Sequence, residues 1–132
     1  MSLAAISVRK SSNFTAWSNE PAVSFEDDSV YDSLEPYFKK FAPTEKLDPY
    51  DGGTLNADCF QGFIRLLEDA RADFLQNEET WIVRKESWNQ GDQIYCRDII
   101  ADKKQVLNVI ENLINLTAVA SVSGNELIFV GD

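Results

Sequence analysis

Hydrophobic residues recur at helical spacing in three segments of the chain. In the first segment, residues 30–41, they follow one another at intervals of three and four positions, which predicts an amphipathic helix. Asp32 and Glu35 have the spacing of a capping box at its start. Pro36 would then fall in the first turn, where amide hydrogens lack partners within the helix, and the helix is predicted to end before Pro43.

The second helical pattern is the clearest and covers about residues 55–77. Its apolar face consists of Phe60, Phe63, Ile64, Leu67, Ala70 and Phe74. The third pattern follows Asp102 and Gln105, which offer a second capping box. Its inner stripe consists of Val106, Val109, Ile110, Leu113 and Thr117. Both patterns predict helices that bury one face and leave the other in water.

Alternating or β-rich segments predict three hairpins. Their strand pairs are residues 4–8 with 14–17, 81–88 with 93–99, and 118–122 with 126–130. The second pair is the best candidate, because Gly91 and Asp92 lie in the short polar segment that divides its strands. In the third pair, Ser123-Gly124-Asn125 supplies the turn.

The resulting order is two strands, two helices, two strands, one helix and two strands. Hairpins replace the regular strand-helix-strand alternation of a doubly wound fold. We therefore predict an α+β fold in which about three helices pack on one face of a mainly antiparallel sheet. A chain of 132 residues, 44% of them hydrophobic, fits a single domain spanning residues 1–132.

Charge is the strongest signal in the composition. The chain has 22 acidic and 12 basic residues, no histidine and a net charge of −10. Because the basic residues occur as isolated pairs or singly and form no basic stripe, nucleic acid and anionic membranes are not expected as partners. Residues 20–58 carry most of the acidic excess. This excess indicates either an ordinary solvated surface or a patch that steers a basic protein partner.

The usual catalytic arrangements are not found in the sequence. Without histidine there is no Ser–His or Cys–His dyad and no histidine-ligated metal. Cys59 and Cys96 are far apart and are interpreted as buried thiols, outside any zinc site or disulfide framework. The acidic residues could hold a hard cation or act as an acid/base pair, but turn and cap roles explain them more simply. We therefore predict no catalytic residues, no metal and no cofactor.

The loop from Asp48 to Gly53 is the most suggestive surface segment. It places Tyr50 between two aspartates, and an aromatic ring ringed by carboxylates is a good anchor for an Arg- or Lys-rich partner. Trp17 and Trp88 are similar candidates if they are exposed. For each tryptophan, packing in the core is the expected outcome, since large aromatic side chains more often pack than protrude.

The chain resembles small acidic immunity proteins in three features. These are the acidic loop, the long amphipathic helix after it and the C-terminal segment over residues 124–132. Such proteins are encoded beside bacterial polymorphic or contact-dependent toxins. The resemblance implies a non-catalytic cytoplasmic protein that binds a toxin domain, often a basic nuclease, and covers its active site. On this hypothesis the contact residues are Glu26, Asp27, Asp28, Asp48, Tyr50 and Asp51.

Two other functions stay open at this point. The chain could be an adaptor or subunit of a larger protein assembly, or a carboxylate-dependent hydrolase. Salt distinguishes toxin neutralisation from an adaptor role. Screening weakens binding through an acidic surface, while binding through an apolar docking face survives added salt. A cytoplasmic location without membrane contact is expected, since no uninterrupted apolar run approaches the roughly 20 residues of a membrane span. The oligomeric state is left open.

Overall fold

The structure is a computed structural model that describes residues 3–9, 22–25, 28–41 and 53–131. Its elements are β1 (Leu3–Arg9), β2 (Ala22–Ser24), α1 (Asp28–Lys40), β3 (Thr54–Leu55), α2 (Ala57–Leu75), β4 (Thr80–Gln90), β5 (Gln93–Asp102), α3 (Lys103–Ser123) and β6 (Asn125–Gly131). The predicted α+β class with antiparallel pairing is confirmed.

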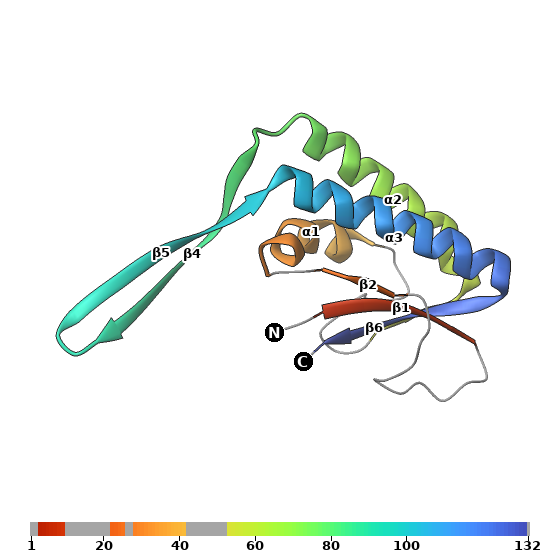
Figure 1. Ribbon diagram of the computed structural model, residues 1–132, viewed down its shortest axis with the longest axis horizontal. Helices are drawn as coiled ribbons and strands as arrows, with labels where there is room; N and C mark the ends of the chain where they lie inside the picture. Colours follow the sequence, from red (N-terminus) through yellow and green to blue (C-terminus); the bar gives the residue numbers. More distant parts are fainter. Residues whose placement is uncertain (1–2, 10–21, 26–27, 42–52, 132) are drawn as a thin grey trace.

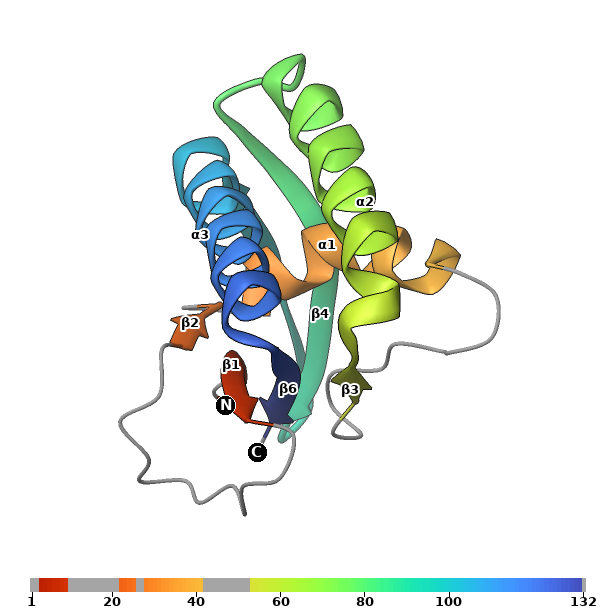
Figure 2. The same ribbon diagram turned by 90° about the vertical axis from the view of Figure 1, so that its right-hand side faces the viewer.

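Four strands form one antiparallel sheet in the order β2-β1-β6-β3, and β4 and β5 form a separate sheet of two strands. The three helices lie over one face of the larger sheet, while the β4–β5 hairpin projects away from the body (Figure 1). Figure 2 shows α2 and α3 side by side with α1 lying across them.

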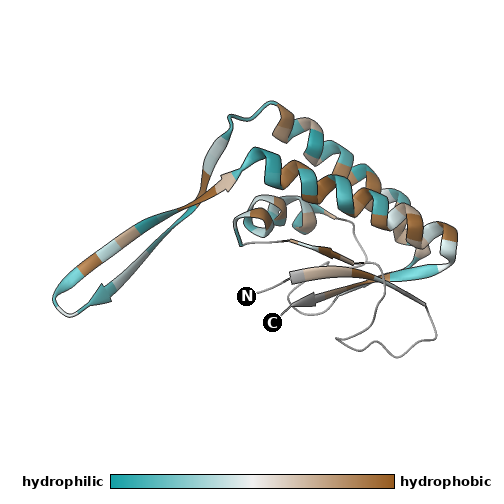
Figure 3. Ribbon diagram, viewed as in Figure 1, coloured by the Kyte–Doolittle hydropathy of each residue, from teal (hydrophilic) through white to brown (hydrophobic). Residues whose placement is uncertain are grey.

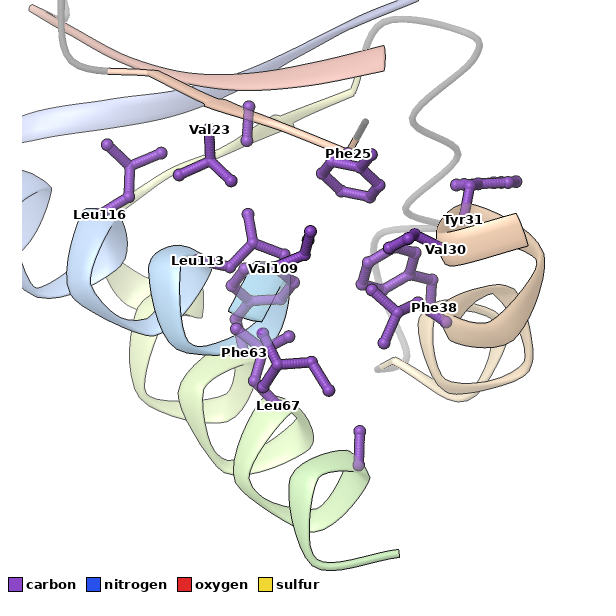
Figure 4. Close-up of a cluster of buried hydrophobic side chains, with 14 of the residues drawn as sticks. Val23, Phe25, Val30, Tyr31, Phe38, Phe63, Leu67, Val109, Leu113 and Leu116 are labelled. Atoms are coloured by element: carbon purple, nitrogen blue, oxygen red, sulfur yellow. The ribbon is translucent and has the colours of Figure 1, made fainter. Parts of the chain in front are cut away.

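The hydrophobic core lies between the larger sheet and the helices. Alternating residues of β1 and β6 point into it: Ala5 and Ser7 on β1 and Leu127 and Phe129 on β6 are fully buried. The side chains that meet there from β2, α1, α2 and α3 are drawn in Figure 4. Burial of these apolar faces drives the helices onto the sheet.

Helix α3 lies at the centre of this core. Its buried residues are Val106, Val109, Ile110, Leu113, Leu116, Thr117 and Ala120. Among the described residues, α3 is the one helix whose length and composition would also suit a bilayer. Its buried stripe packs against α2, β1 and β6, which is the arrangement of a core helix.

Helix α1 begins earlier than predicted. It starts at Asp28, so Asp32 lies inside the helix and is not a cap, and Pro36 is an interior residue instead of a first-turn one. An interior proline costs a helix about 3 kcal/mol. Burial of the apolar face, which includes Leu34 and Phe38, offsets this cost at about 1.5–3 kcal/mol for each large side chain.

The predicted hairpin over residues 118–122 and 126–130 is half wrong. Residues 118–122 continue α3, because Ala120 extends its buried stripe while Val119 and Val122 face outward. Gly124 ends the helix with a φ of 70°, a left-handed conformation that glycine adopts without strain. Residues 126–130 do form a strand, as predicted, and it pairs with β1 and β3.

The other predicted elements are mostly confirmed. Helix α2 buries the expected face, with Ile64 only half-buried, and Asp102 caps α3 by accepting a bond from the amide of Gln105. The predicted N-terminal strand exists as β1, and its hairpin partner among the described residues is β2. Residues 14–17, predicted as that partner, lie outside the described residues. The sequence reading missed the short strands β2 and β3.

Tyr37 connects α1 to α2 and makes stability sensitive to alkaline pH. Its hydroxyl donates to Asp73 (2.7 Å), and burial together with this carboxylate raises the pKa of Tyr37 from 10.0 to about 12. The protonated phenol is therefore favoured in the folded state. Its stabilising contribution is complete below pH 10.0 and is lost as the pH rises through about 12.

We expect urea unfolding at a series of pH values to show this loss in the wild type and not in Tyr37→Phe. A spectroscopic titration of the wild type should show a tyrosine with a pKa of about 12 that is missing from the variant. If the two proteins have superimposable profiles of stability against pH, the assignment to Tyr37 is wrong.

Candidate partner-binding surface

Of the six predicted contact residues, the structure describes only Asp28. Glu26, Asp27, Asp48, Tyr50 and Asp51 lie outside the described residues, as does Trp17. Asp28 is half-buried at the first position of α1. It lines a shallow hollow of about 330 Å³ with Ser29, Arg97, Asp98, Ile99 and Ile100. The hollow places one predicted residue beside strand β5, which the sequence had not connected with it.

The β4–β5 hairpin, called the arm below, carries the largest group of exposed apolar side chains. Among the described residues, five of the eight exposed large hydrophobic side chains belong to it: Ile82, Trp88, Ile94, Tyr95 and Ile100. In Figure 3 the hydrophobic positions of the arm are interspersed with hydrophilic ones along its length. The arm therefore presents apolar surface to water on an element that stands away from the core.

The tip of the arm is a tight turn of two residues, Gly91 and Asp92. Gly91 has a φ of 66°, which the favoured two-residue hairpin turns require and which a residue with a Cβ adopts only with strain. The turn holds the strands in continuous register from Gln90 opposite Gln93 to Arg84 opposite Ile99, where a bulge follows. Ile82 then pairs with Ile100, so both lie on the same face as Lys85 and Asp98.

The base of the arm is anchored in the body by Trp81. Its ring stacks on Phe74 at a centroid distance of 5.3 Å and an angle of 10°, and its Nε1 donates to Ser33 Oγ (3.3 Å). Opposite Trp81, Ala101 is completely buried. Lys103 adds bonds from its Nζ to the carbonyl oxygens of Leu75 and Asn77. These contacts set the direction in which the arm leaves the body.

One face of the arm, the inner face, looks toward α1 and carries a chain of ion pairs. Arg84 contacts Asp32 of α1 (2.6 Å) and Glu86 (2.6 Å), and Glu86 also contacts Arg97 (2.7 Å). The bond to Asp32 raises the pKa of the Arg84 guanidinium, and the bond from Arg97 lowers the pKa of the Glu86 carboxyl. Arg84 and Glu86 thus both stay charged near neutral pH.

Aromatic side chains continue the inner face toward the tip. Trp88 and Tyr95 are cross-strand partners whose rings stack at 5.8 Å and 17°. The Arg97 guanidinium lies 6.0 Å from the centre of the Trp88 ring, at the outer limit of a cation–π contact. Trp88 is still 44% exposed, so the expectation that it packs in the core is wrong.

The opposite face, the outer face, consists of Ile82, Lys85, Ser87 and Asn89 on β4 and Ile94, Cys96, Asp98 and Ile100 on β5. Its three isoleucines are 50%, 74% and 56% exposed in the order Ile82, Ile94 and Ile100. Lys85 and Asp98 are direct cross-strand partners, yet the described residues show no ion pair within 4.0 Å for either. Both charges are available to a partner.

Cys96 also corrects the sequence interpretation. Neither cysteine forms a disulfide, but Cys59 is only half-buried and Cys96 is exposed on the outer face, so the expectation of two buried thiols is wrong for Cys96. The sequence of β5 does not signal this exposure, because apolar side chains occupy both alternating faces, Ile94 and Ile100 on one and Tyr95 and Ile99 on the other, which is also the pattern of a strand buried on both faces. A strand that packs on a core through one face keeps its apolar residues on that face.

The remaining surface of the described residues offers little that is built for chemistry. A groove of about 490 Å³ runs between β2 and α3 and is lined in part by Asn112, Asn115 and Val119. Within residues 3–9, 22–25, 28–41 and 53–131, no three Cys, Asp or Glu side chains are grouped to hold a metal ion. No protein-family model, curated protein or solved structure matches the chain.

Proposed function

We propose that the protein is a non-catalytic binding protein, an adaptor or subunit of a protein assembly, that docks onto another protein chain through the arm. One observation carries this proposal: a two-stranded sheet that stands clear of the core exposes five large apolar side chains. Exposed apolar side chains concentrated on one projecting element, on both of its faces, are typical of an interaction site.

The physical state of an uncovered arm supports a docking role. A two-stranded hairpin is at best marginally stable in water, because each strand has hydrogen-bonding partners on one side only. The outer edges of β4 and β5 pair with no other described strand. A partner that covers the arm would remove apolar area from water at about 25 cal/mol for each Å². It could also satisfy the backbone groups of an open edge.

A second candidate is the neutralisation of a basic toxin domain by covering its active site. The net charge of −10 favours it, because a strongly acidic protein attracts a basic domain at long range and accelerates their encounter. Asp28 would contribute to such a surface from the base of the arm. The third possibility, a carboxylate-dependent hydrolase, gains no support from the described residues.

The test compares Ile94→Glu on the arm with Val122→Glu on α3. Both positions are highly exposed, at 74% and 90%, so each change adds one negative charge without disturbing the core. With tagged protein expressed in the native host, we expect wild type and Val122→Glu to retain a common set of partners. Ile94→Glu should lose them. Equal retention by all three proteins would overturn the docking role of the arm.

Salt then separates the two candidates. Raising ionic strength from about 0.1 M to about 1 M shortens the screening length from about 10 Å to about 3 Å. Docking through apolar side chains of the arm should survive this change. Complete loss of the retained partners at the higher salt would instead favour an acidic surface directed at a basic domain.

A further inference from the structure

We propose that the outer face of the arm pairs with the outer face of a second copy of this chain. The two arms would lie parallel, related by a two-fold axis that runs along them between the two faces. This inference rests on the proposed function, since it takes the arm as the docking element and names what covers one of its faces.

The pattern of the outer face is complementary to itself in this arrangement. From the base toward the tip, its cross-strand levels are Ile82 with Ile100, Lys85 with Asp98, Ser87 with Cys96 and Asn89 with Ile94. A two-fold axis along the arms places β4 of one copy over β5 of the other. Each residue of β4 therefore faces, in the other copy, the residue of β5 that is its own cross-strand partner. Lys85 of each copy thus faces Asp98 of the other.

The opposite orientation of the arms does not have this property. If the axis ran across the strands, β4 of one copy would lie over β4 of the other. Matching the charged levels would then bring Lys85 against Lys85 and Asp98 against Asp98. Like charges that meet in an interface disfavour that arrangement, so charge selects the parallel pairing.

The apolar levels supply the attraction in the parallel pairing. At the base, Ile82 and Ile100 from both copies would form a cluster of four isoleucines, and all of these side chains are at least half exposed in the single chain. Ile94 of each copy would be covered near the tip. Burial of such side chains is the main favourable term in protein association, while the two ion pairs fix orientation and register.

The fold leaves the outer face open to a second copy. Arg84 binds Asp32, and Trp81 donates to Ser33, so this part of helix α1 lies on the inner side of the arm. The first residues of α1, Asp28 and Ser29, line a hollow with Asp98 and Ile100, and Ile100 still remains 56% exposed. The two-fold axis then places the two bodies on opposite sides of the paired arms. Packed sheets lie about 10 Å apart, a distance that a lysine and an aspartate side chain can span together.

The decisive experiment uses two charge reversals, Lys85→Asp and Asp98→Lys. Either variant alone would oppose like charges at both intermolecular contacts, and we expect its dimer dissociation constant to rise at least about tenfold, the equivalent of about 1.4 kcal/mol. An equimolar mixture of the two variants should form a heterodimer, because the introduced aspartate of one chain then faces the introduced lysine of the other. Sedimentation velocity on the wild type, each variant and the mixture measures these states.

The mixture distinguishes contacts between chains from those within one chain. In it, each chain still carries like charges at its own cross-strand level, so only an intermolecular contact between positions 85 and 98 can be restored. Lys104→Asp and Asp69→Lys are the matched controls, since they make the same changes of net charge at exposed helix positions off the arm. Each control alone should remain as dimeric as the wild type.

Three results would overturn the inference: a monomeric wild type at all accessible concentrations, a dimer that neither reversal weakens, or a mixture that stays monomeric. Each leaves the proposed function open to its own test. If the wild type is a monomer and its partners are still lost in Ile94→Glu, the docking role of the arm is supported and the pairing of two copies is contradicted. If the mixture restores the dimer but no other partner depends on the arm, the pairing of two copies is supported and the adaptor role is contradicted.

Discussion

Replacing Phe63 with alanine is expected to lower the free energy of unfolding by about 3–5 kcal/mol. Phe63 is completely buried on α2. Its ring lies 6.1 Å from that of Phe38, 5.7 Å from that of Phe41 and 6.0 Å from that of Phe129, so it joins α1, α2 and the larger sheet. Truncation would remove contacts on three sides and leave a cavity that rigid elements cannot close.

Urea unfolding followed by circular dichroism measures this loss. The expected change is a large part of the roughly 5–15 kcal/mol that stabilises a typical domain, so Phe63→Ala should be near the limit of folding. Leu75→Ala is the control on the same helix: Leu75 is 52% exposed, and its truncation should change stability by no more than about 0.5 kcal/mol. Equal effects of the two substitutions would contradict the position of the core.

Replacing Trp81 with alanine is expected to cost about 3 kcal/mol and to loosen the arm. The value is at the lower end for a truncated tryptophan because Trp81 is only partly buried. The variant loses the stack on Phe74 and leaves Ser33 Oγ without the indole donor. Since Trp81 anchors the base of β4, amide hydrogens of β4 and β5 should exchange faster than in the wild type.

Two further substitutions separate the contributions of Trp81. Trp81→Phe keeps an aromatic ring on Phe74 but loses the bond to Ser33 and part of the ring area, so it should cost at least about 1 kcal/mol and less than Trp81→Ala. Trp88→Ala removes an equally large ring from the exposed part of the arm, and its effect should be limited to the stack on Tyr95 and the contact with Arg97, about 0.5–1.5 kcal/mol. If Trp81→Ala leaves exchange in the arm unchanged, Trp81 does not anchor it.

The helices were predictable because their signals are local. Phe60, Phe63, Leu67, Ala70 and Phe74 recur at helical spacing, and all of them are buried on α2. Asp102 was readable as a cap because its side chain needs a partner only three residues away. Within a single turn of helix or one hairpin loop, the two interacting residues are only a few positions apart, so a short stretch of sequence shows both of them.

The wrong predictions occur where the neighbouring residues fit two different structures equally well. Residues 118–122 alternate well enough for a strand, yet they continue α3 because Ala120 fits against the sheet one turn beyond Leu116. Likewise, Asp32 resembled a helix cap and instead bonds to Arg84, 52 residues away. Neither outcome could be read from neighbouring residues, since the competing partner comes from elsewhere in the chain.

The candidate site shows the same division. The hairpin and its glycine turn were predicted, and Trp88 was named as an anchor on condition that it is exposed. That β4 and β5 form their own sheet, and so leave Ile94 and Cys96 uncovered, depends on which strands fill the four-stranded sheet. Pairing of β1 with β6 across more than a hundred residues fills those positions and excludes the arm.

By itself, then, the amino-acid sequence determines the helices, most strands, the antiparallel α+β class and the acidic character of this protein. Periodicity, capping and charge are properties of short segments or of the whole composition. The projection of the arm, the exposure of its apolar side chains and the partners of Arg84 were settled only when distant segments packed together. The hydrophobic effect favours the burial of apolar side chains but does not specify which segment is buried. The strands compete for places in one sheet, and that competition leaves β4 and β5 outside it.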